Sequence, residues 1–426
     1  MRLLVVGGGG REHALIKALK KNPKIEKIFA LPGNGGIAAD AECVGINAKD
    51  IPSIVDFAVA NAVDFAVVAP DDPLVLGAVD ELNAAGIPCF GPDKAAAAIE
   101  GSKVFAKELM QKYGIPTADF EVFDDADSAL EYLKSCEYPA VIKADGLALG
   151  KGVVIPSNFE EAQEAIRTIM VDRAFGASGN RVIIEQCLKG PEVSVLAFAD
   201  GKTVVPMVSS MDHKRIGDGD VGPNTGGMGA VAPNPYYTKE IASECMERIF
   251  LPTIDAMNKE GRPFRGCLYF GLMLTASGPM VIEYNCRFGD PETQVVLPLM
   301  ESDLLSAMLA TANGTLADTP IRFGSGSACC VVAASKGYPK AYETGKEIHL
   351  KGADELPNVD VFHAGTALKD GKLTTSGGRV LGVTAVADDL GTAIEKAYAA
   401  ASRIEFDGIY TRKDIGKRAL AANNTR

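Results

Sequence analysis

Short apolar runs that alternate with helical patterns open the chain. Strands are expected at 2–6, 64–69 and 88–90, and helices at about 11–20, 51–61 and 74–85. Because Gly, Pro and Asp bound the apolar runs, this alternation predicts a parallel sheet with helices on both faces. Two helices follow in succession, the second capped at Ser102 and ended by Gly114 and Pro116. We therefore expect an N-terminal α/β domain over residues 1–102.

From residue 119 the pattern changes to a small α+β unit. Strands are expected at 119–123, 138–144, 153–156 and 181–186, and helices from about 125 and from a cap at Asn158. A hairpin turning at Asp200-Gly201 follows, then a long helix at about 238–260, a second hairpin ending near 285 and helices near 291–313. Strands at 328–334 and 379–387 and a helix near 388–402 predict a small C-terminal α+β domain over 328–426.

A glycine-rich segment, residues 210–229, interrupts the middle region. It carries six glycines and little apolar content. A structureless loop of this length inside a compact domain is usually functional or disordered. We expect an irregular, movable loop here, with a surface charge cluster as the alternative reading of its DHKR stretch at 212–215.

Composition narrows the class of protein. A chain of 426 residues is too long for one ordinary domain. Its net charge of −12 offers no general footprint for nucleic acid or an anionic membrane. No apolar run reaches the ~18 residues of a membrane span, and the five-residue N-terminal apolar stretch is short for a signal sequence. We expect a cytoplasmic protein that binds neither nucleic acid nor membrane.

Cysteine and histidine usage excludes further classes. Nine cysteines without a CxxC pair argue for reduced, mostly buried thiols rather than disulfides or a zinc site. Four histidines without HExxH spacing, and no GxSxG, disfavour zinc and serine hydrolases.

The N-terminal VVGGGGREH follows a predicted strand and opens a helix. Backbone N–H groups at such a helix start can bind phosphate, which we assign to Gly9, Gly10 and Arg11. A tight turn without ligand is the alternative. A dinucleotide fingerprint would need Gly where Glu12 stands, and the acidic residue expected after the second strand is missing. A dehydrogenase is therefore a weak rival.

The segment DGLALGKGV resembles a P-loop but has the wrong spacing and joins two strands. It can still cover phosphates as a mobile lid, with Lys143 on the preceding strand reaching them. A flexible glycine hairpin with surface lysines is the alternative. Beyond it, Glu185 and Glu192 flank a stretch whose backbone at 186–188 could meet an adenine edge, although the same stretch also reads as an ordinary strand and turn.

The stretch VIEYNCRFGDPE carries the most specific chemistry. Alternate residues of a strand share a face, so Glu283 and Asn285 point the same way, with Arg287 near them. Carboxylate and carbonyl oxygens suit Mg²⁺, and an adjacent Arg can neutralise a transferring phosphoryl group. A solvated edge strand is the alternative. The DHKR cations could close over a reactive phosphate and exclude water.

Together these segments resemble the ATP-grasp ligases, in which ATP lies between two α+β subdomains. The similarity extends to the phosphoribosylamine–glycine ligase (glycinamide ribonucleotide synthetase) family of purine biosynthesis. It rests on GGGGREHAL, PGNGG, EGSK, VIKADGLALGKGV, DHKRIGDGDVGPNTGGMGA, IEYNCRFGDPETQ, FHAGT and GGRVL, which follow in that family's order and spacing from residue 7 to about 381. The blocks at 212–230 and 282–294 are the most specific.

The resemblance implies a fold and a reaction. The fold is a Rossmann-like pre-ATP-grasp domain (1–102), an ATP-grasp domain (103–327) with a lid subdomain at about 120–190, and the C-terminal domain (328–426). Glycine's carboxylate would attack the γ-phosphate of ATP to give glycyl phosphate. The amine of 5-phosphoribosylamine would then displace phosphate, giving glycinamide ribonucleotide, ADP and phosphate. ATP is a co-substrate, Mg²⁺ or Mn²⁺ the metal, and a monomer is expected.

The resemblance also assigns roles to individual residues. ATP would be bound by Lys103, Lys143, Gly150, Gly152, Glu185, Leu188 and Glu192, and the metal by Glu283 and Asn285. Asp212, Lys214 and Arg287 would be catalytic, and substrate would contact Gly9, Gly10, Arg11, Asp71, Asp212 and Arg287, with groups near His363–Thr366 adding to the phosphoribosyl contacts.

The chain departs from the family pattern at three positions. Gly8 replaces the usual Asn or Ser, Asp71 replaces a Glu, and Met273 stands where many ATP-grasp enzymes place a second acidic metal ligand. The shorter Asp71 leaves its grip on ribose open, and Met273 predicts a metal site completed by phosphate and water. The rivals are an ATP-grasp ligase for another carboxylate and amine, a non-catalytic nucleotide-binding protein, and a dehydrogenase.

Overall fold

The structure is a computed structural model that describes residues 1–147 and 152–424. Its N-terminal sheet contains five parallel strands in the order β3-β2-β1-β4-β5. The strands are β1 (Arg2–Gly7), β2 (Lys27–Pro32), β3 (Glu42–Cys43), β4 (Phe65–Val68) and β5 (Cys89–Phe90). The helices around them are α1 (Gly10–Leu19), α2 (Ile51–Ala60), α3 (Asp71–Leu76), α4 (Ala78–Ala84), α5 (Lys94–Gly101) and α6 (Lys103–Tyr113), with a short 3₁₀ turn at Ile37–Ala39. The predicted parallel α/β arrangement is confirmed.

One expected helix is wrong in detail. The pattern at 74–85 predicts a single helix, but the structure divides it into α3 and α4 at Gly77. Gly77 has φ of 95°, a left-handed conformation that ends α3 and that glycine adopts at little cost. The break lets α3 begin earlier, at Asp71, directly after β4.

A small four-stranded sheet, here called the side sheet, follows. Its antiparallel strands run in the order β6-β9-β7-β8: β6 (Phe120–Phe123), β9 (Val182–Gln186), β7 (Ala140–Ala144) and β8 (Val153–Val154). It is accompanied by α7 (Ala126–Leu133), α8 (Phe159–Ile166) continuing as a π-helical turn at Arg167–Val171, and a 3₁₀ turn at Gly176–Gly179. Asn158 caps α8 as predicted, since its Oδ1 accepts the Glu161 N–H at 2.9 Å. The side sheet and its helices enclose a hydrophobic core of their own.

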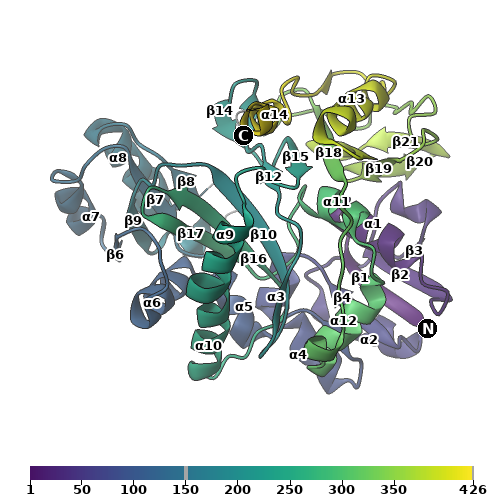
Figure 1. The fold of residues 1–426 in the computed structure, drawn as a ribbon, viewed down its shortest axis with the longest axis horizontal. Helices are drawn as coiled ribbons and strands as arrows, with labels where there is room; N and C mark the ends of the chain where they lie inside the picture. The colour runs from purple at the N-terminus through teal and green to yellow at the C-terminus, as the bar shows by residue number, and fades with distance from the viewer. Residues whose placement is uncertain (148–151, 425–426) are drawn as a thin grey trace.

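The central sheet joins the side sheet to the rest of the molecule. Its antiparallel strands run in the order β11-β10-β16-β17: β11 (Val204–Pro206), β10 (Glu192–Asp200), β16 (Arg265–Thr275) and β17 (Gly278–Asn285). Both predicted hairpins are present. The predicted long helix is α9 (Lys239–Cys245), a π-helical turn (Met246–Phe250) and α10 (Leu251–Lys259) in succession. Figure 1 shows the side sheet on one side of the central sheet and the N-terminal sheet on the other.

A C-terminal sheet completes the fold. Its path is β12-β15-β18-β22-β19, with β23 also paired to β18: β12 (Met211–Asp212), β15 (Gly229–Ala232), β18 (Ser327–Ser335), β22 (Arg379–Ala387), β19 (Val359–His363) and β23 (Ile409–Tyr410). The remaining elements are α11 (Thr293–Val296), a 3₁₀ turn at Leu297–Leu299, α12 (Leu304–Asn313), a 3₁₀ turn at Leu316–Asp318, the hairpin β20 (Thr366–Lys369) and β21 (Lys372–Thr375), α13 (Leu390–Ala401) and α14 (Lys417–Asn424). The multidomain α/β and α+β fold class is confirmed.

The expectation of a structureless loop at 210–229 is wrong. Besides β12 and the start of β15, the segment forms the hairpin β13 (Arg215–Gly217) and β14 (Val221–Asn224). Its two ends pair with each other, and β15 pairs with β18, Gly229 lying opposite Val331. A hundred residues separate these partners in the sequence, so no local pattern could indicate the pairing. The segment therefore belongs to the C-terminal sheet by its hydrogen bonds.

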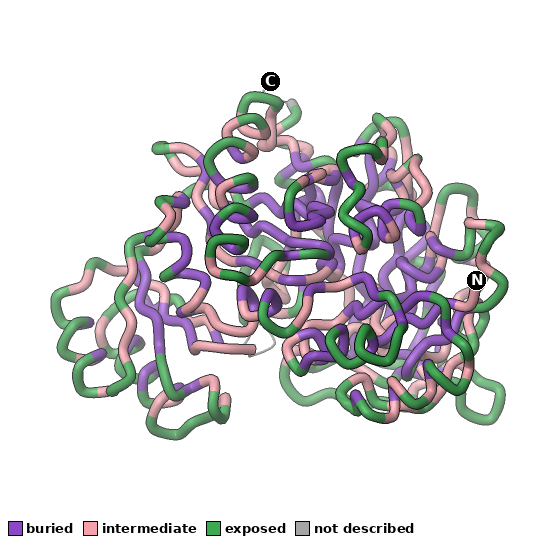
Figure 2. The backbone as a smooth tube through the Cα atoms, turned by 90° about the horizontal axis from the view of Figure 1, so that it is seen from below, coloured by how far each residue is buried: buried purple, intermediate pink, exposed green. Residues whose placement is uncertain are grey.

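Two large hydrophobic cores lie against opposite faces of the N-terminal sheet. Leu3 and Val5 of β1 belong to one, which extends through α1, α11 and the C-terminal sheet, and Leu4 and Val6 belong to the other, which extends to the central sheet. Figure 2 shows the buried backbone running through the body of the molecule. Both faces of the sheet are therefore covered, as expected for parallel strands with near-continuous apolar runs.

All nine cysteines are free, and six of them are buried, as expected for mostly buried thiols. Within the described residues, no helix is long and apolar enough to span a bilayer.

Candidate active site

The strand order of the N-terminal sheet has a switch point, the place at which open α/β sheets form their ligand-binding crevice. Strands β2 and β3 lie to one side of β1, and β4 and β5 lie to the other, so the topology reverses between β1 and β4. Ligands of open α/β sheets bind at the carboxyl ends of the strands at such a point. Gly9, Gly10 and Arg11 follow β1, and Asp71 follows β4, so the crevice brings together all four residues that the sequence assigned to substrate at this end.

The start of α1 is already partly occupied by its own side chain. Glu12 Oε2 accepts the Gly9 N–H at 2.6 Å, and Glu12 Oε1 accepts from Arg11 Nε at 2.7 Å. A Cβ on Gly7 would lie 2.6 Å from Glu12 Cγ. Glu12, which stands where the dinucleotide fingerprint has glycine, therefore lies against Gly7 and takes up the Gly9 N–H. A phosphate here would be held by the N–H groups that follow Gly9.

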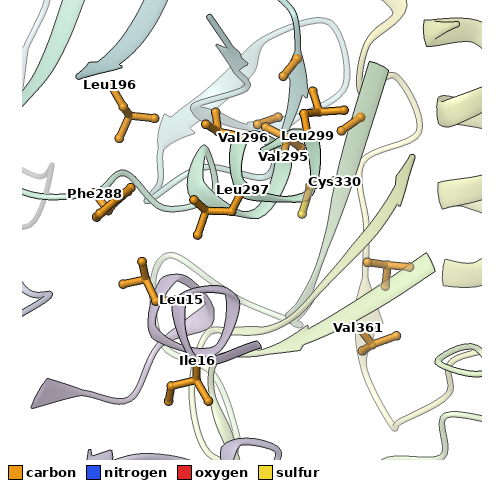
Figure 3. Packing of buried hydrophobic residues seen from close by; sticks show 14 of the residues in the cluster. Leu15, Ile16, Leu196, Phe288, Val295, Val296, Leu297, Leu299, Cys330 and Val361 are labelled. Carbon is orange, nitrogen blue, oxygen red and sulfur yellow. The ribbon is translucent and has the colours of Figure 1, made fainter. Parts of the chain in front are cut away.

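The packing of α1 places the glycine-rich loop before it beside the GDPE segment (residues 289–292). Leu15 and Ile16 of α1 share a core with Val295 and Leu297, as Figure 3 shows. The apolar face of α1 therefore fixes where its N-terminus points.

Contacts at that N-terminus confirm the placement. Arg11 Nη1 donates to the Phe288 carbonyl at 3.0 Å. A Cβ built on Gly10 would lie 2.6 Å from Gln294 Nε2, and one on Gly9 would lie 3.5 Å from Asp290 Oδ2. Glycine at 9 and 10 thus permits a close approach that larger residues would block.

Glu283 and Asn285 lie at the end of β17, where the alternation of the strand still holds. The register with β16 shifts by one residue, so that Gly271 opposes Glu283 and Leu272 opposes Val281, leaving Ile282 as the extra residue. Since the bulge precedes Glu283, the two polar side chains remain on one face, as predicted. Their alternate neighbour Tyr284 is buried in the core.

Three lysines and a buried glutamate face this strand end. Lys143 Nζ donates to Glu185 Oε2 at 3.0 Å and to the Ile282 carbonyl at 2.9 Å, so the side sheet is bonded to the bulge of β17. Lys103 Nζ donates to the Gly146 carbonyl at 2.5 Å, which ties α6 to the loop after β7. Lys107, which the sequence analysis did not single out, lies 3.3 Å from the same Glu185 carboxylate.

Burial shifts the pKa values of this cluster. It lowers the pKa of Lys103, although Glu283 opposes the shift. It lowers the pKa of Lys107 to about 8, against the opposing effect of Glu185. Burial would raise the pKa of Glu283, but Lys214 and Lys143 outweigh it and hold that pKa below its ordinary value. The cluster therefore surrounds the ionised carboxylate of Glu283 with lysine side chains.

The DHKR stretch brings Asp212 and Lys214 close to the end of β17. Lys214 Nζ lies 3.3 Å from Glu192 Oε2 and 3.6 Å from Glu283 Oε1. The carboxylate of Glu192 raises the pKa of Lys214 well above its ordinary value, and this effect outweighs the opposing effect of burial. Burial and the nearby Glu292 raise the pKa of Asp212 well above its usual range. Lys214 is therefore a firm cation here, and Asp212 is a carboxyl group close to a second buried carboxylate.

Arg287 connects the strand end to the crevice. Its Nη2 donates to Asn285 Oδ1 at 3.2 Å and lies 3.2 Å from Glu100 Oε1. Glu100 is buried and also accepts the Cys286 N–H at 2.7 Å. Burial would raise the pKa of Asp71, but Arg287 and Arg11 outweigh it and lower that pKa. Arg287 thus stands between the proposed metal pair and the proposed substrate crevice.

The remaining assigned residues are placed as follows. Leu188 is half-buried after β9, and Gly152 lies before β8, where its carbonyl accepts the Ala144 N–H at 2.9 Å. Gly150 lies outside the described residues.

Sequence reasoning missed several groups of this site. Glu100 lies in an alanine-rich helix that reads as ordinary, and Arg379 is distant in sequence. Arg379 Nη1 donates to the carbonyls of Gly226 (2.6 Å) and Asp290 (2.8 Å), so it ties the glycine-rich segment to the GDPE turn. The acidic residues of GDPE could have been singled out, since Asp290 and Glu292 lie in the same block as Arg287.

The oxygen donors at the end of β17 fit a hard divalent cation. A carboxylate and an amide oxygen on one strand face, with Glu283 ionised, are ligand types that Mg²⁺ accepts. No cluster of three or more His, Cys, Asp or Glu side chains able to hold a metal occurs in the described part of the chain. A metal held by Glu283 and Asn285 would therefore need further oxygens from phosphate and water.

Comparison with known proteins places the chain among synthetases of one kind. Three family models match: the phosphoribosylglycinamide synthetase N domain over residues 1–100, its ATP-grasp (A) domain over 101–293 and its C domain over 328–418. A protein of Caldanaerobacter subterraneus subsp. tengcongensis named phosphoribosylamine–glycine ligase is 50% identical over 97% of this chain and 99% of its own.

Solved structures agree. The crystal structure of a phosphoribosylamine–glycine ligase from Thermotoga maritima has a TM-score of 0.86 and 36% identity, covering 97% of this chain and 100% of that one. The biotin carboxylase domain of a Hydrogenobacter thermophilus 2-oxoglutarate carboxylase, crystallised with MgADP, has a TM-score of 0.74, covering 96% of this chain and 91% of that one. At 19% identity the latter shows a shared fold alone.

Proposed function

The chain belongs to the phosphoribosylglycinamide synthetase family, and from this we propose that it ligates glycine to 5-phosphoribosylamine at the expense of ATP. The product is glycinamide ribonucleotide, with ADP and phosphate released, a step of purine biosynthesis. The observation that carries the proposal is the convergence of five segments at the end of β17. They are α6 and β7 with their lysines, the DHKR stretch, the GDPE turn and the start of α1. The domain limits that we propose remain 1–102, 103–327 and 328–426.

ATP would lie between the side sheet and the central sheet. Lys103, Lys143 and Glu185 come from elements that flank this position, and Glu192 opens β10 beside them. Lysines that already have carboxylate and carbonyl partners can turn to phosphate oxygens, which also accept charge-assisted hydrogen bonds from an ammonium group. Leu188 and Gly152 would contact the nucleotide from the side-sheet strands, and Gly150 from the neighbouring segment.

Mg²⁺, or Mn²⁺, would be held by Glu283 and Asn285 together with phosphate oxygens and water. The bound cation would neutralise charge on the transferring phosphoryl group. Lys214 Nζ lies 3.6 Å from Glu283 Oε1, so its ammonium group would lie beside the acyl phosphate that the cation helps to hold. Arg287 would likewise exchange its bond to Asn285 for one to substrate oxygens.

The chain's own residues act by position and charge. Glycine's carboxylate oxygen forms a bond to the γ-phosphorus of ATP as the bond to ADP breaks, giving glycyl phosphate. Lys214 and Arg287 would stabilise the negative charge that gathers on this group. The amine of 5-phosphoribosylamine then bonds to the glycyl carbonyl carbon, and phosphate leaves. Asp212, whose pKa burial and Glu292 raise, would bind glycine's amino group or take a proton from the attacking amine.

The phosphoribosyl group would occupy the crevice between β1 and β4. The helix start at Gly10 and Arg11 offers N–H groups for its phosphate, and Asp71 offers a carboxylate for its ribose hydroxyls. Arg11 and Arg287 hold Asp71 ionised, which favours acceptance of hydroxyl hydrogen bonds. The ring-closed sugar would thus present its amine toward Arg287.

The test is ADP formation with ATP and Mg²⁺, measured with glycine alone, 5-phosphoribosylamine alone, and both. Turnover is expected only with both substrates. Replacing glycine by alanine or β-alanine, and the amine by ammonia, tests the rival that the chain ligates another pair. Turnover that is independent of glycine, or equal with alanine, would overturn the proposal. Sedimentation of the same sample tests the expected monomer.

A further inference from the structure

The C-terminal segment 409–418 lies against the glycine-rich segment that carries Lys214. At its centre is Arg412, whose side chain is 1% exposed. Its Nε and Nη2 donate to the two carboxylate oxygens of Asp414 at 2.8 and 2.9 Å. Its Nη1 donates to Asp220 Oδ1 at 2.9 Å and to the Arg215 carbonyl at 3.0 Å. One buried guanidinium therefore joins β13, the turn of its hairpin and the C-terminal segment.

Further bonds follow the same seam. They are Tyr410 Oη to the Ile216 carbonyl (2.8 Å), Lys413 N to Asp218 Oδ1 (2.7 Å), Gly219 N to Asp414 Oδ2 (2.8 Å) and Arg418 Nη1 to Asp220 Oδ2 (3.3 Å). Figure 1 shows β14 beside α14, near the C-terminus. We call this set of contacts the C-terminal latch. It grips the hairpin β13–β14 from Arg215 to Asp220.

His213 extends the latch contacts to Gly229 of β15 and to Gly416. Its ring is buried, with Nδ1 3.2 Å from the Gly229 carbonyl and Nε2 accepting the Gly416 N–H at 3.1 Å. The Gly229 carbonyl accepts, so Nδ1 carries the proton and the ring is neutral. While His213 faces the latch, Lys214 next to it reaches Glu192 and Glu283. One short stretch thus presents one side chain to the latch and the next to the reaction site.

Stability alone does not account for Arg412. Replacing a buried ion pair by apolar side chains is often neutral or stabilising, because burying the charges costs about as much as their attraction returns. What a bidentate Arg–carboxylate pair adds is fixed geometry. The hairpin it fixes has three glycines of positive φ or close packing (Gly217, Gly219 and Gly222) and few apolar anchors of its own.

We propose that Arg412 is a positioning residue for the ligation reaction, which with Asp414, Asp220 and His213 holds the hairpin β13–β14 so that Lys214 stays against Glu192 and Glu283. The inference rests on the proposed function, because it assigns Lys214 to the acyl phosphate. Loss of the latch leaves the ATP-binding lysines in place, since Lys103 and Lys143 belong to α6 and β7. The defect therefore falls on glycine activation and not on ATP binding.

Two variants loosen the latch in different ways. Arg412→Met removes the guanidinium, and Asp220→Asn removes one carboxylate at an exposed position whose φ of 56° suits Asn. If Arg412→Met fails to fold, Asp220→Asn still allows the proposal to be tested. Amide exchange over residues 211–228 is expected to quicken by about tenfold or more in both, and exchange in the side sheet to stay unchanged.

The chemical reactivity of the Lys214 amine is a second measurement, and it does not depend on enzyme activity. Paired with Glu192, it should be methylated slowly by formaldehyde and borohydride at pH 8, compared with the exposed Lys369. In Arg412→Met the ratio of the two rates is expected to rise several-fold. The variant should also lose about tenfold or more in kcat/KM for glycine while the Kd of an ATP analogue stays within about twofold.

The control is Val383→Ala, which leaves a cavity beside β22 and lowers stability while keeping every latch residue. If it reproduces the loss of glycine activity at an equal drop in Tm, or if the latch variants keep wild-type exchange and Lys214 reactivity, the inference is overturned. Failure of the proposed function looks different. The wild-type enzyme would then show no glycine-dependent turnover, while exchange and Lys214 reactivity still respond to Arg412→Met.

Discussion

Replacing Glu283 by Gln removes a charge from the end of β17 while keeping the shape of the side chain. Lys214 lies 3.6 Å away, and Lys103 and Lys143 also act on this carboxylate. In Glu283→Gln these cations lose their shared anion, and the proposed metal loses its only anionic protein ligand. An amide still offers one oxygen, so the fold of the strand end should persist.

The effects on stability and on rate should separate. The side chains of Glu283 and Lys214 are 31% and 34% exposed, so their pair resembles a surface salt bridge worth about 0–1 kcal/mol. We therefore expect Tm to change by no more than about 2–4 °C. Loss of one group that stabilises the transferring phosphoryl should cost about 3–4 kcal/mol, or about 10²–10³ in kcat. The activity loss exceeds what instability can explain.

The assay is ADP release at saturating ATP, glycine and 5-phosphoribosylamine, with Mg²⁺ titrated from below to far above the ATP concentration. Glu283→Gln is expected to need more Mg²⁺ for half-maximal rate, and excess metal should recover part of the loss. Glu108→Gln, an exposed carboxylate on α6, is the matched control and should behave as wild type. A Glu283→Gln enzyme with near-normal kcat and an unchanged Mg²⁺ dependence would refute the metal assignment.

Three further outcomes are expected. Burial first, and then Arg412, lowers the pKa of His213 to about 4. Because the unfolded chain then binds a proton that the folded chain does not, the free energy of unfolding should be unaffected by this group above pH 6.5 and should fall by about 3 kcal/mol as the pH drops to 4. Urea unfolding of His213→Asn should show a smaller loss of stability between these two pH values. Arg287→Met leaves Glu100 buried without its cation and should lower the free energy of unfolding by about 3–5 kcal/mol, and equal stability with wild type in urea would contradict the pairing. Asp71→Ala should raise KM for 5-phosphoribosylamine by about 10–100-fold with the Kd of ATP unchanged, and a change confined to ATP would move Asp71 out of the substrate crevice.

Local patterns predicted the parts of the fold that local forces decide. The alternation of apolar strands and helices identified the parallel sheet, and the turn at Asp200-Gly201 identified the first hairpin. The pair Glu283 and Asn285 was predicted for the same reason, since side chains two apart share a strand face. The bulge at Ile282 did not disturb this because it precedes both residues. An extra residue between Glu283 and Asn285 would have put them on opposite faces.

The predictions failed where structure depends on distant partners. The segment 210–229 looks irregular because its own composition offers no reason to pair. Its strand β15 exists because β18 lies beside it, and its hairpin is held by Arg412 and Asp414. Glu100 was missed for a related reason. Nothing near it in the sequence marks it as polar and buried, and only its contacts with Cys286 and Arg287 do so.

These distant partners also explain how one short segment can serve two purposes. Asp212, His213 and Lys214 follow one another, and the extended backbone sends neighbouring side chains in opposite directions. His213 is bonded to the C-terminal segment, and Lys214 reaches Glu192 and Glu283. The proposed reacting groups therefore need no bulky anchors of their own, and the glycines that follow them would let substrate approach closely. The anchor is supplied by residues about 200 positions later in the sequence, among them the buried Arg412.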